Sequence, residues 1–161
     1  MRNVILSSVA SIGLLFSAPV SAQSFLSTGT TTWTSLPGSV AVQKNGGPLL
    51  GCTLSFNLVN SGSSITANSA SLVGSGGFCS SVLFTGAGWP AVWNSSTQKL
   101  TVGPIFIDTT ITDGDCEGYL VFEYDAGAPE SLSIETGFAT PSTIPQAPSG
   151  GDCKIEGVVF N

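Results

Sequence analysis

Residues 52–60 read CTLSFNLVN, a stretch in which apolar and polar residues alternate. Four of them fall on the same side of an extended chain: Cys52, Leu54, Phe56 and Leu58. This period of two is typical of a β-strand that buries one face in a core. The stretch therefore predicts a strand whose cysteine side chain points into the protein.

Two other cysteines introduce segments of the same kind. CKIEGVVFN, which begins at Cys153, alternates in the same way, and CEGYLVFEY, which begins at Cys116, keeps apolar residues on both sides. Each cysteine falls on the core-facing side of its segment. We expect three strands that each begin at a cystine.

The rest of the chain has the same β texture. No segment has the 3.6-residue apolar period of a helix, and Gly, Pro, Ser and Asn interrupt the sequence at short intervals. This spacing is typical of an antiparallel sandwich or barrel. We predict an all-β fold, a single antiparallel β-sandwich of the Ig-like or jelly-roll-like type, with two disulfides. The predicted strands are Thr28–Leu36, Val40–Gln43, Cys52–Asn60, Ser64–Val73, Ser80–Phe84, Ala91–Asn94, Lys99–Val102, Ile105–Thr112, Gly118–Tyr124, Ser131–Thr136 and Ile155–Phe160.

The first 22 residues have the pattern of a cleaved export signal. Arg2 precedes an apolar run from Val4 to Phe16, and small residues lead to Ala22. The run is shorter than the roughly 20 residues of a membrane span, and no later segment is long or apolar enough either. We expect cleavage before Gln23, export from the cell, and a single domain over residues 23–161. Residues 138–151, rich in Pro, Ser and Gly, are expected to form a surface loop.

The four cysteines are expected to form two disulfides, because an even count in an exported chain is typical of structural bridges. There is no histidine and no C-x-x-C pair, which disfavours a zinc site. Three pairings are open. We favour the sequential one, Cys52 with Cys79 and Cys116 with Cys153.

Charge limits the partners. The chain has four basic and ten acidic residues, a net charge of -6, and residues 23–107 contain no acid. Nucleic acids and anionic lipids are poor partners, since both need clustered Lys and Arg. We expect a solvated acidic face in the second half of the chain.

The sequence predicts no enzyme and no cofactor. A Ser-His-Asp triad is excluded without histidine. Paired carboxylates of a glycosidase remain as a minor alternative, with no spacing that identifies a pair. The available acids are Glu117, Glu123, Asp125, Glu130 and Glu135.

A weak calcium candidate lies in the segment DTTITDGDCE. Asp113, Asp115 and Glu117 surround a glycine there, although the order of an EF-hand loop is missing. An ordinary Asp-Gly turn between strands has the same composition, and we favour it.

Several short motifs, taken in order, resemble the PraB-like protein activators of alkane oxidation, which are small exported bacterial proteins. They are STGTTTWT near residue 27, GCTLSF at Gly51, GGFC before Ser80, the turn GAGWP and the closing GDCKIEGVVF. The acidic second half and the long Pro-rich loop depart from the family pattern.

The resemblance implies an extracellular, non-enzymatic protein that promotes the use of insoluble alkanes, as a surface-active or cell-surface or matrix protein. Trp33, Trp89 and Trp93 are the candidate contacts with a hydrocarbon surface, because an indole is apolar with one polar group. Core packing is the alternative for each. The runner-up function is a self-assembling subunit of a pilus-like or matrix fibre, and a secreted glycoside-acting enzyme ranks third.

Overall fold

The computed structural model describes residues 25–44, 47–74, 77–109, 116–134 and 153–161. Within these ranges the chain forms strands and one short 3-10 helix, η2 (Cys79–Ser81). The strands are β1 (Gly29–Ser35), β2 (Val40–Lys44), β3 (Leu50–Asn60), β4 (Ile65–Gly74), β5 (Val82–Thr85), β6 (Trp89–Asn94), β7 (Lys99–Thr109), β8 (Cys116–Asp125), β9 (Ser131–Ile134) and β10 (Cys153–Phe160).

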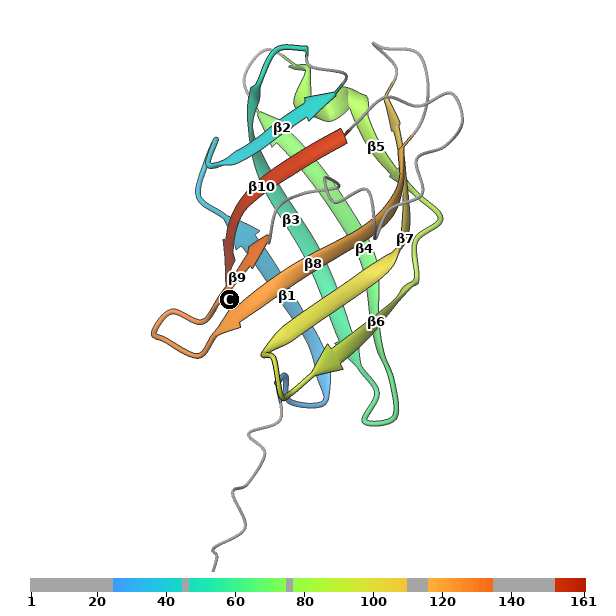
Figure 1. Ribbon diagram of the computed structural model, residues 1–161, viewed down its shortest axis with the longest axis vertical. Coiled ribbons are helices and arrows are strands. Elements are labelled where there is room, and N and C mark those ends of the chain that lie inside the picture. The colour runs from blue at the N-terminus through green and yellow to red at the C-terminus, as the bar shows by residue number, and fades with distance from the viewer. Residues whose placement is uncertain (1–24, 45–46, 75–76, 110–115, 135–152) are drawn as a thin grey trace, which may run out of the picture.

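All ten strands belong to one antiparallel sheet that closes on itself (Figure 1). The sheet runs from β3 through β4, β6, β7, β8 and β9 to β10. It returns to β3 because β10 also pairs with β1 and β2, which both pair with β3. The predicted β-sandwich is therefore wrong, and the fold is a β-barrel. Alternation along each strand is the same in both architectures, so it could not distinguish them.

Two positions of the barrel are each occupied by a pair of shorter strands. β1 and β2 lie end to end between β3 and β10, and β5 and β6 lie end to end beside β7. Ten strands therefore fill eight positions. The break between β1 and β2 is a turn in which Ser39 N donates to Leu36 O at 3.1 Å. Buried Ser35 fills this break, since its Oγ donates to Leu36 O and accepts from Leu54 N.

The strand boundaries agree with the sequence in most places. The alternation of β3 is confirmed, with Cys52, Leu54, Phe56 and Leu58 all buried. Two boundaries are wrong. No break separates the segments predicted to end at 102 and to begin at 105, because β7 is continuous and only its register with β8 shifts between Val102 and Ile105. Residues 80 and 81, predicted to begin a strand, belong to η2. The predicted loop at 138–151 lies outside the described residues.

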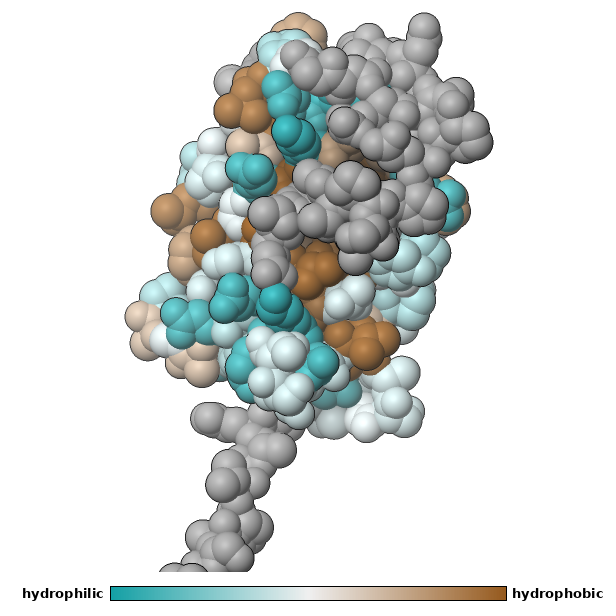
Figure 2. Space-filling view, viewed as in Figure 1, coloured by the Kyte–Doolittle hydropathy of each residue, from teal (hydrophilic) through white to brown (hydrophobic). Residues whose placement is uncertain are grey.

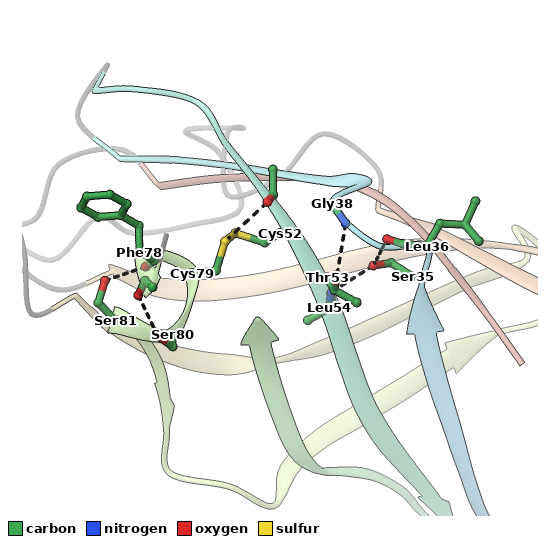
Figure 3. Close-up of a disulfide and its surroundings, with 12 residues drawn as sticks. Ser35, Leu36, Gly38, Cys52, Thr53, Leu54, Phe78, Cys79, Ser80 and Ser81 are labelled. Carbon is green, nitrogen blue, oxygen red and sulfur yellow. Dashed lines mark hydrogen bonds between the residues drawn. A yellow bond between two sulfur atoms is a disulfide. The ribbon is translucent and has the colours of Figure 1, made fainter. Parts of the chain in front are cut away.

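Both disulfides lie at one end of the barrel, which we call the cystine end. Cys52 on β3 is bonded to Cys79 in η2 (Figure 3), and Cys116 on β8 to Cys153 on β10. The sequential pairing is thus confirmed. All four cysteines are buried, so both bridges lie on the core side. One links β3 to η2, and the other links β8 to β10.

The opposite end of the barrel holds a cluster of aromatic rings, which we call the aromatic end. Phe25, which precedes β1, is 4% exposed and stacks on Trp93 with the ring centroids 4.1 Å apart. The ring of Tyr124 meets that of Phe25 edge-on, with the centroids 4.8 Å apart. The centroid of the Trp33 ring lies 6.3 Å from that of Phe25. The carbonyl of Leu26 accepts from Asn60 Nδ2 at 3.0 Å, which anchors the segment. The Phe25 side chain therefore closes the aromatic end of the barrel core.

The aromatic end gives a testable pH dependence. Burial raises the pKa of the Tyr124 phenol above its ordinary value of 10.0, and the hydrogen bond to Glu130 and the charges of Glu130 and Asp125 raise it further. The unfolded chain then loses the phenolic proton at a lower pH than the folded chain. The resulting stabilisation is complete below the unfolded pKa and is lost as the pH rises through the folded value.

We expect Tyr124→Phe to flatten the fall in the free energy of unfolding that the wild-type protein shows as the pH rises above about 10. Urea unfolding at a series of pH values measures this slope. Tyr119→Phe makes the same chemical change at an exposed position and is the matched control for the substitution. Equal slopes for wild type and Tyr124→Phe would contradict the assignment.

Among the described residues, no helix has the length and apolar character needed to cross a membrane.

Candidate interfacial surface

The three tryptophans proposed as interfacial contacts point inward or lie at the edge of the core. Trp33 is 0% exposed and Trp89 is 3% exposed, so the folded barrel presents neither indole to an external surface. Trp89 Nε1 donates to Thr85 O at 3.0 Å, which satisfies its polar group inside the protein. Trp93 is half-buried and stacks on Phe25.

A different set of apolar side chains faces outward near the cystine end. We call it the outer apolar patch, and it comprises five exposed residues: Val73, Phe78, Leu83, Phe106 and Tyr119. They come from β4, the residue before η2, β5, β7 and β8 in turn. These elements are neighbours in the barrel wall, since β5 contacts β4 and pairs with β7, and β7 pairs with β8.

The strand register brings the members of the patch together. Leu83 pairs with Asp108, two residues from Phe106, so Leu83 and Phe106 are diagonal neighbours on the outer face. Phe106 pairs with Glu117, which makes Tyr119 its diagonal neighbour on the other side. Leu83, Phe106 and Tyr119 therefore form a row across β5, β7 and β8, with the carboxylates of Asp108 and Glu117 beside it.

Phe78 is the member of the patch that lies beside the Cys52–Cys79 bridge. It is 52% exposed and lies directly before Cys79, and Figure 3 shows its ring directed away from the Cys52–Cys79 bridge. Its carbonyl accepts from Ser81 N at 3.2 Å and from Ser81 Oγ at 2.6 Å. The bridge and the helical turn thus hold an exposed phenyl ring on a fixed backbone.

The outer faces of β1 and β3, and of the part of β4 around Ser69, have the opposite character. They carry uncharged polar side chains in cross-strand rows: Thr32 Oγ1 donates to Asn57 Oδ1 at 2.7 Å, and Asn57 Nδ2 donates to Ser69 Oγ at 3.0 Å. On the face visible in Figure 2, hydrophobic residues occur in separate groups between hydrophilic ones. The described surface therefore combines hydrated polar rows with localised apolar areas.

The acidic residues in the described part of the chain lie mostly at exposed positions. Glu123, Asp125 and Glu130 are exposed, and Glu117 is half-buried on β8. No group of three or more metal-ligating side chains occurs among the described residues. Asp113, Asp115 and Glu135 lie outside them, so the calcium prediction stays a prediction.

Runs of three consecutive apolar residues in the sequence could have indicated the patch. In VLF at Val82 and in IFI at Ile105, three apolar residues follow one another, and a strand must turn the middle one away from the core. Those middle residues are Leu83 and Phe106. Their exposure follows from strand geometry once the inward-facing neighbours are known.

Together these features define a class of protein: a small disulfide-bonded β-barrel that presents an apolar area on a mainly uncharged polar surface. The comparison with known families identifies it further. The chain belongs to the PraA/PraB-like family of alkane oxidation protein activators, whose family model matches residues 1–160. The resemblance found in the sequence motifs is thereby confirmed. No curated protein and no solved structure matches the chain.

Proposed function

We propose that this protein is exported, has no catalytic activity of its own, and promotes the use of insoluble alkanes by adsorbing to the hydrocarbon surface through the outer apolar patch. The exposed row of Leu83, Phe106 and Tyr119 on β5, β7 and β8 is the observation that carries the proposal. Contiguous exposed apolar side chains are typical of interaction surfaces.

Two further features support this function. Two cystines in a chain of this size are typical of oxidising compartments outside the cytosol, in agreement with export. The family description concerns activation of alkane oxidation. A protein that coats an alkane droplet would act before the oxidation itself, by increasing the area of contact between cells and hydrocarbon.

The barrel fits this role better than strand exchange between subunits. β1 and β10, the strands suited to exchange, are both paired within the monomer: β1 with β3 and β10, and β10 with β1, β2 and β9. Donated-strand assembly completes a sheet that lacks a strand. Here the ring is complete with the chain's own strands.

The experiment compares two double variants at a hexadecane–water boundary. Phe78→Ser/Leu83→Ser removes two members of the patch, and Leu36→Ser/Val92→Ser removes two residues of similar exposure outside it. We expect wild type to lower the interfacial tension and to stabilise droplets. The patch variant should need about tenfold more protein for the same effect, because the buried apolar area falls.

Pendant-drop tensiometry measures the concentration dependence, and circular dichroism checks that both variants keep the wild-type fold. The control variant should behave as wild type. Equal losses in the two variants would assign adsorption to general hydrophobicity, and unchanged adsorption in the patch variant would overturn the proposal.

A further inference from the structure

The cystine end contains an apolar pocket that the outer patch does not include. Its volume is about 80 Å³. Its lining comes from β10, β2 and β3, which are neighbours in the barrel wall, and from the paired strands β5 and β7. The residues that line it are Val42, Gln43, Lys44, Gly47, Pro48, Leu50, Val82, Ile107, Cys153 and Ile155.

The chemistry of the pocket is that of an aliphatic slot. Its inner wall consists of branched aliphatic side chains, of which Ile107 and Ile155 are fully buried and Val82 nearly so. Gln43, one of its polar residues, has its amide engaged already, since Nε2 donates to Gly47 O at 2.7 Å. The pocket therefore offers dispersion contacts rather than a hydrogen-bonding pattern.

The pocket lies inside the barrel wall, whereas the patch lies outside it. Val82 and Leu83 are consecutive on β5, so one strand contributes Val82 to the pocket and Leu83 to the patch. On β7, likewise, Ile107 lines the pocket and Phe106 belongs to the patch. A chain end in the pocket would thus lie close to the surface proposed to rest on hydrocarbon.

We infer that this pocket binds the terminal carbons of an unbranched alkane. The inference rests on the proposed function for the source of the ligand and on the lining residues for its chemistry. A cavity of this size admits a chain end rather than a whole long-chain molecule. Each methylene that leaves water for an aliphatic wall strengthens binding by about fourfold, which makes a few carbons sufficient for measurable affinity.

The test uses n-hexane as the probe and methyl NMR of the folded protein as the readout. We expect saturable shifts of the methyl signals of Val42, Val82, Ile107 and Ile155. Leu50→Trp places a bulky ring in the lining and should weaken hexane binding about fifteenfold, the loss expected when roughly two methylenes are excluded. Leu49→Trp, at an exposed neighbouring position outside the lining, should bind as wild type.

Pro48→Trp, at the exposed rim of the pocket, is a second blocking variant. It provides the test if the NMR spectrum of Leu50→Trp shows that this variant does not fold. Phe78→Ser/Leu83→Ser should keep hexane binding, which separates the pocket from the adsorbing patch. The inference is overturned if hexane shifts none of the lining methyls, or if both blocked variants bind as wild type. Shifts with hexanoate but not with hexane would likewise overturn it, because they assign the pocket to acyl amphiphiles instead.

Discussion

Replacing Phe25 with alanine is expected to lower the free energy of unfolding by about 3–5 kcal/mol, the range for large aromatic side chains removed from a core. Phe25 is 4% exposed and touches the rings of Trp93 and Tyr124. Its removal would leave a cavity at the aromatic end and uncover part of Trp33. Neighbouring rings are held by the barrel strands and cannot easily collapse into the space.

Urea unfolding of the oxidised protein, followed by tryptophan fluorescence, measures this loss. Phe78→Ala is the matched control, since it makes the same chemical change at an exposed position. It should alter the free energy of unfolding by no more than about 0.5 kcal/mol. A similar small effect of Phe25→Ala would show that the segment before β1 does not seal the barrel in solution.

Removing the second disulfide by Cys116→Ala/Cys153→Ala is expected to lower the free energy of unfolding by about 4 kcal/mol in the loop-entropy description. The two cysteines are separated by 37 positions, so the bridge closes a long loop in the unfolded chain. The bridge also ties the first residue of β10 to the first residue of β8. Without it, that end of β10 is held by its ladder with β2.

Two measurements check this prediction. Urea unfolding gives the global loss, and amide hydrogen exchange should show faster exchange at residues 154–156 than at residues 158–160, which pair with β9. The comparison variant Cys52→Ala/Cys79→Ala removes a loop of similar length, with a separation of 27. It should cost about as much stability without selectively loosening β10. Equal exchange along β10 in both variants would contradict the local role of the bridge.

The inward faces of the strands and the cystine framework could be predicted from the sequence, and closure of the sheet could not. Leu54, Phe56 and Leu58 are buried as their alternation requires, because side-chain direction is a local property of a strand. Closure depends instead on pairs such as Ile155 with Val42 and Phe160 with Thr34. These pairs join strands far apart in the chain, and no local pattern states which strands meet.

The candidate surface was predicted less well than the fold. Tryptophan is the residue that sequence reasoning selects for interfacial contact, yet Trp33 and Trp89 serve the core. Which aromatic residue is exposed depends on strand phase, and phase is ambiguous where apolar residues are consecutive. The pocket could not be predicted at all, since Val42, Val82 and Ile155 come from three strands that only the closed barrel brings together.

The pairing of β10 has a consequence for how the chain acquires its fold. Because β10 is bonded to β9 on one side and to β1 and β2 on the other, the ring stays open until residues 153–160 are in place. Contacts between the first and last strands make folding slow, as in other topologies dominated by distant pairs. In a chain exported from its amino-terminal end, as proposed above, the barrel could therefore close only after residues 153–160 had emerged.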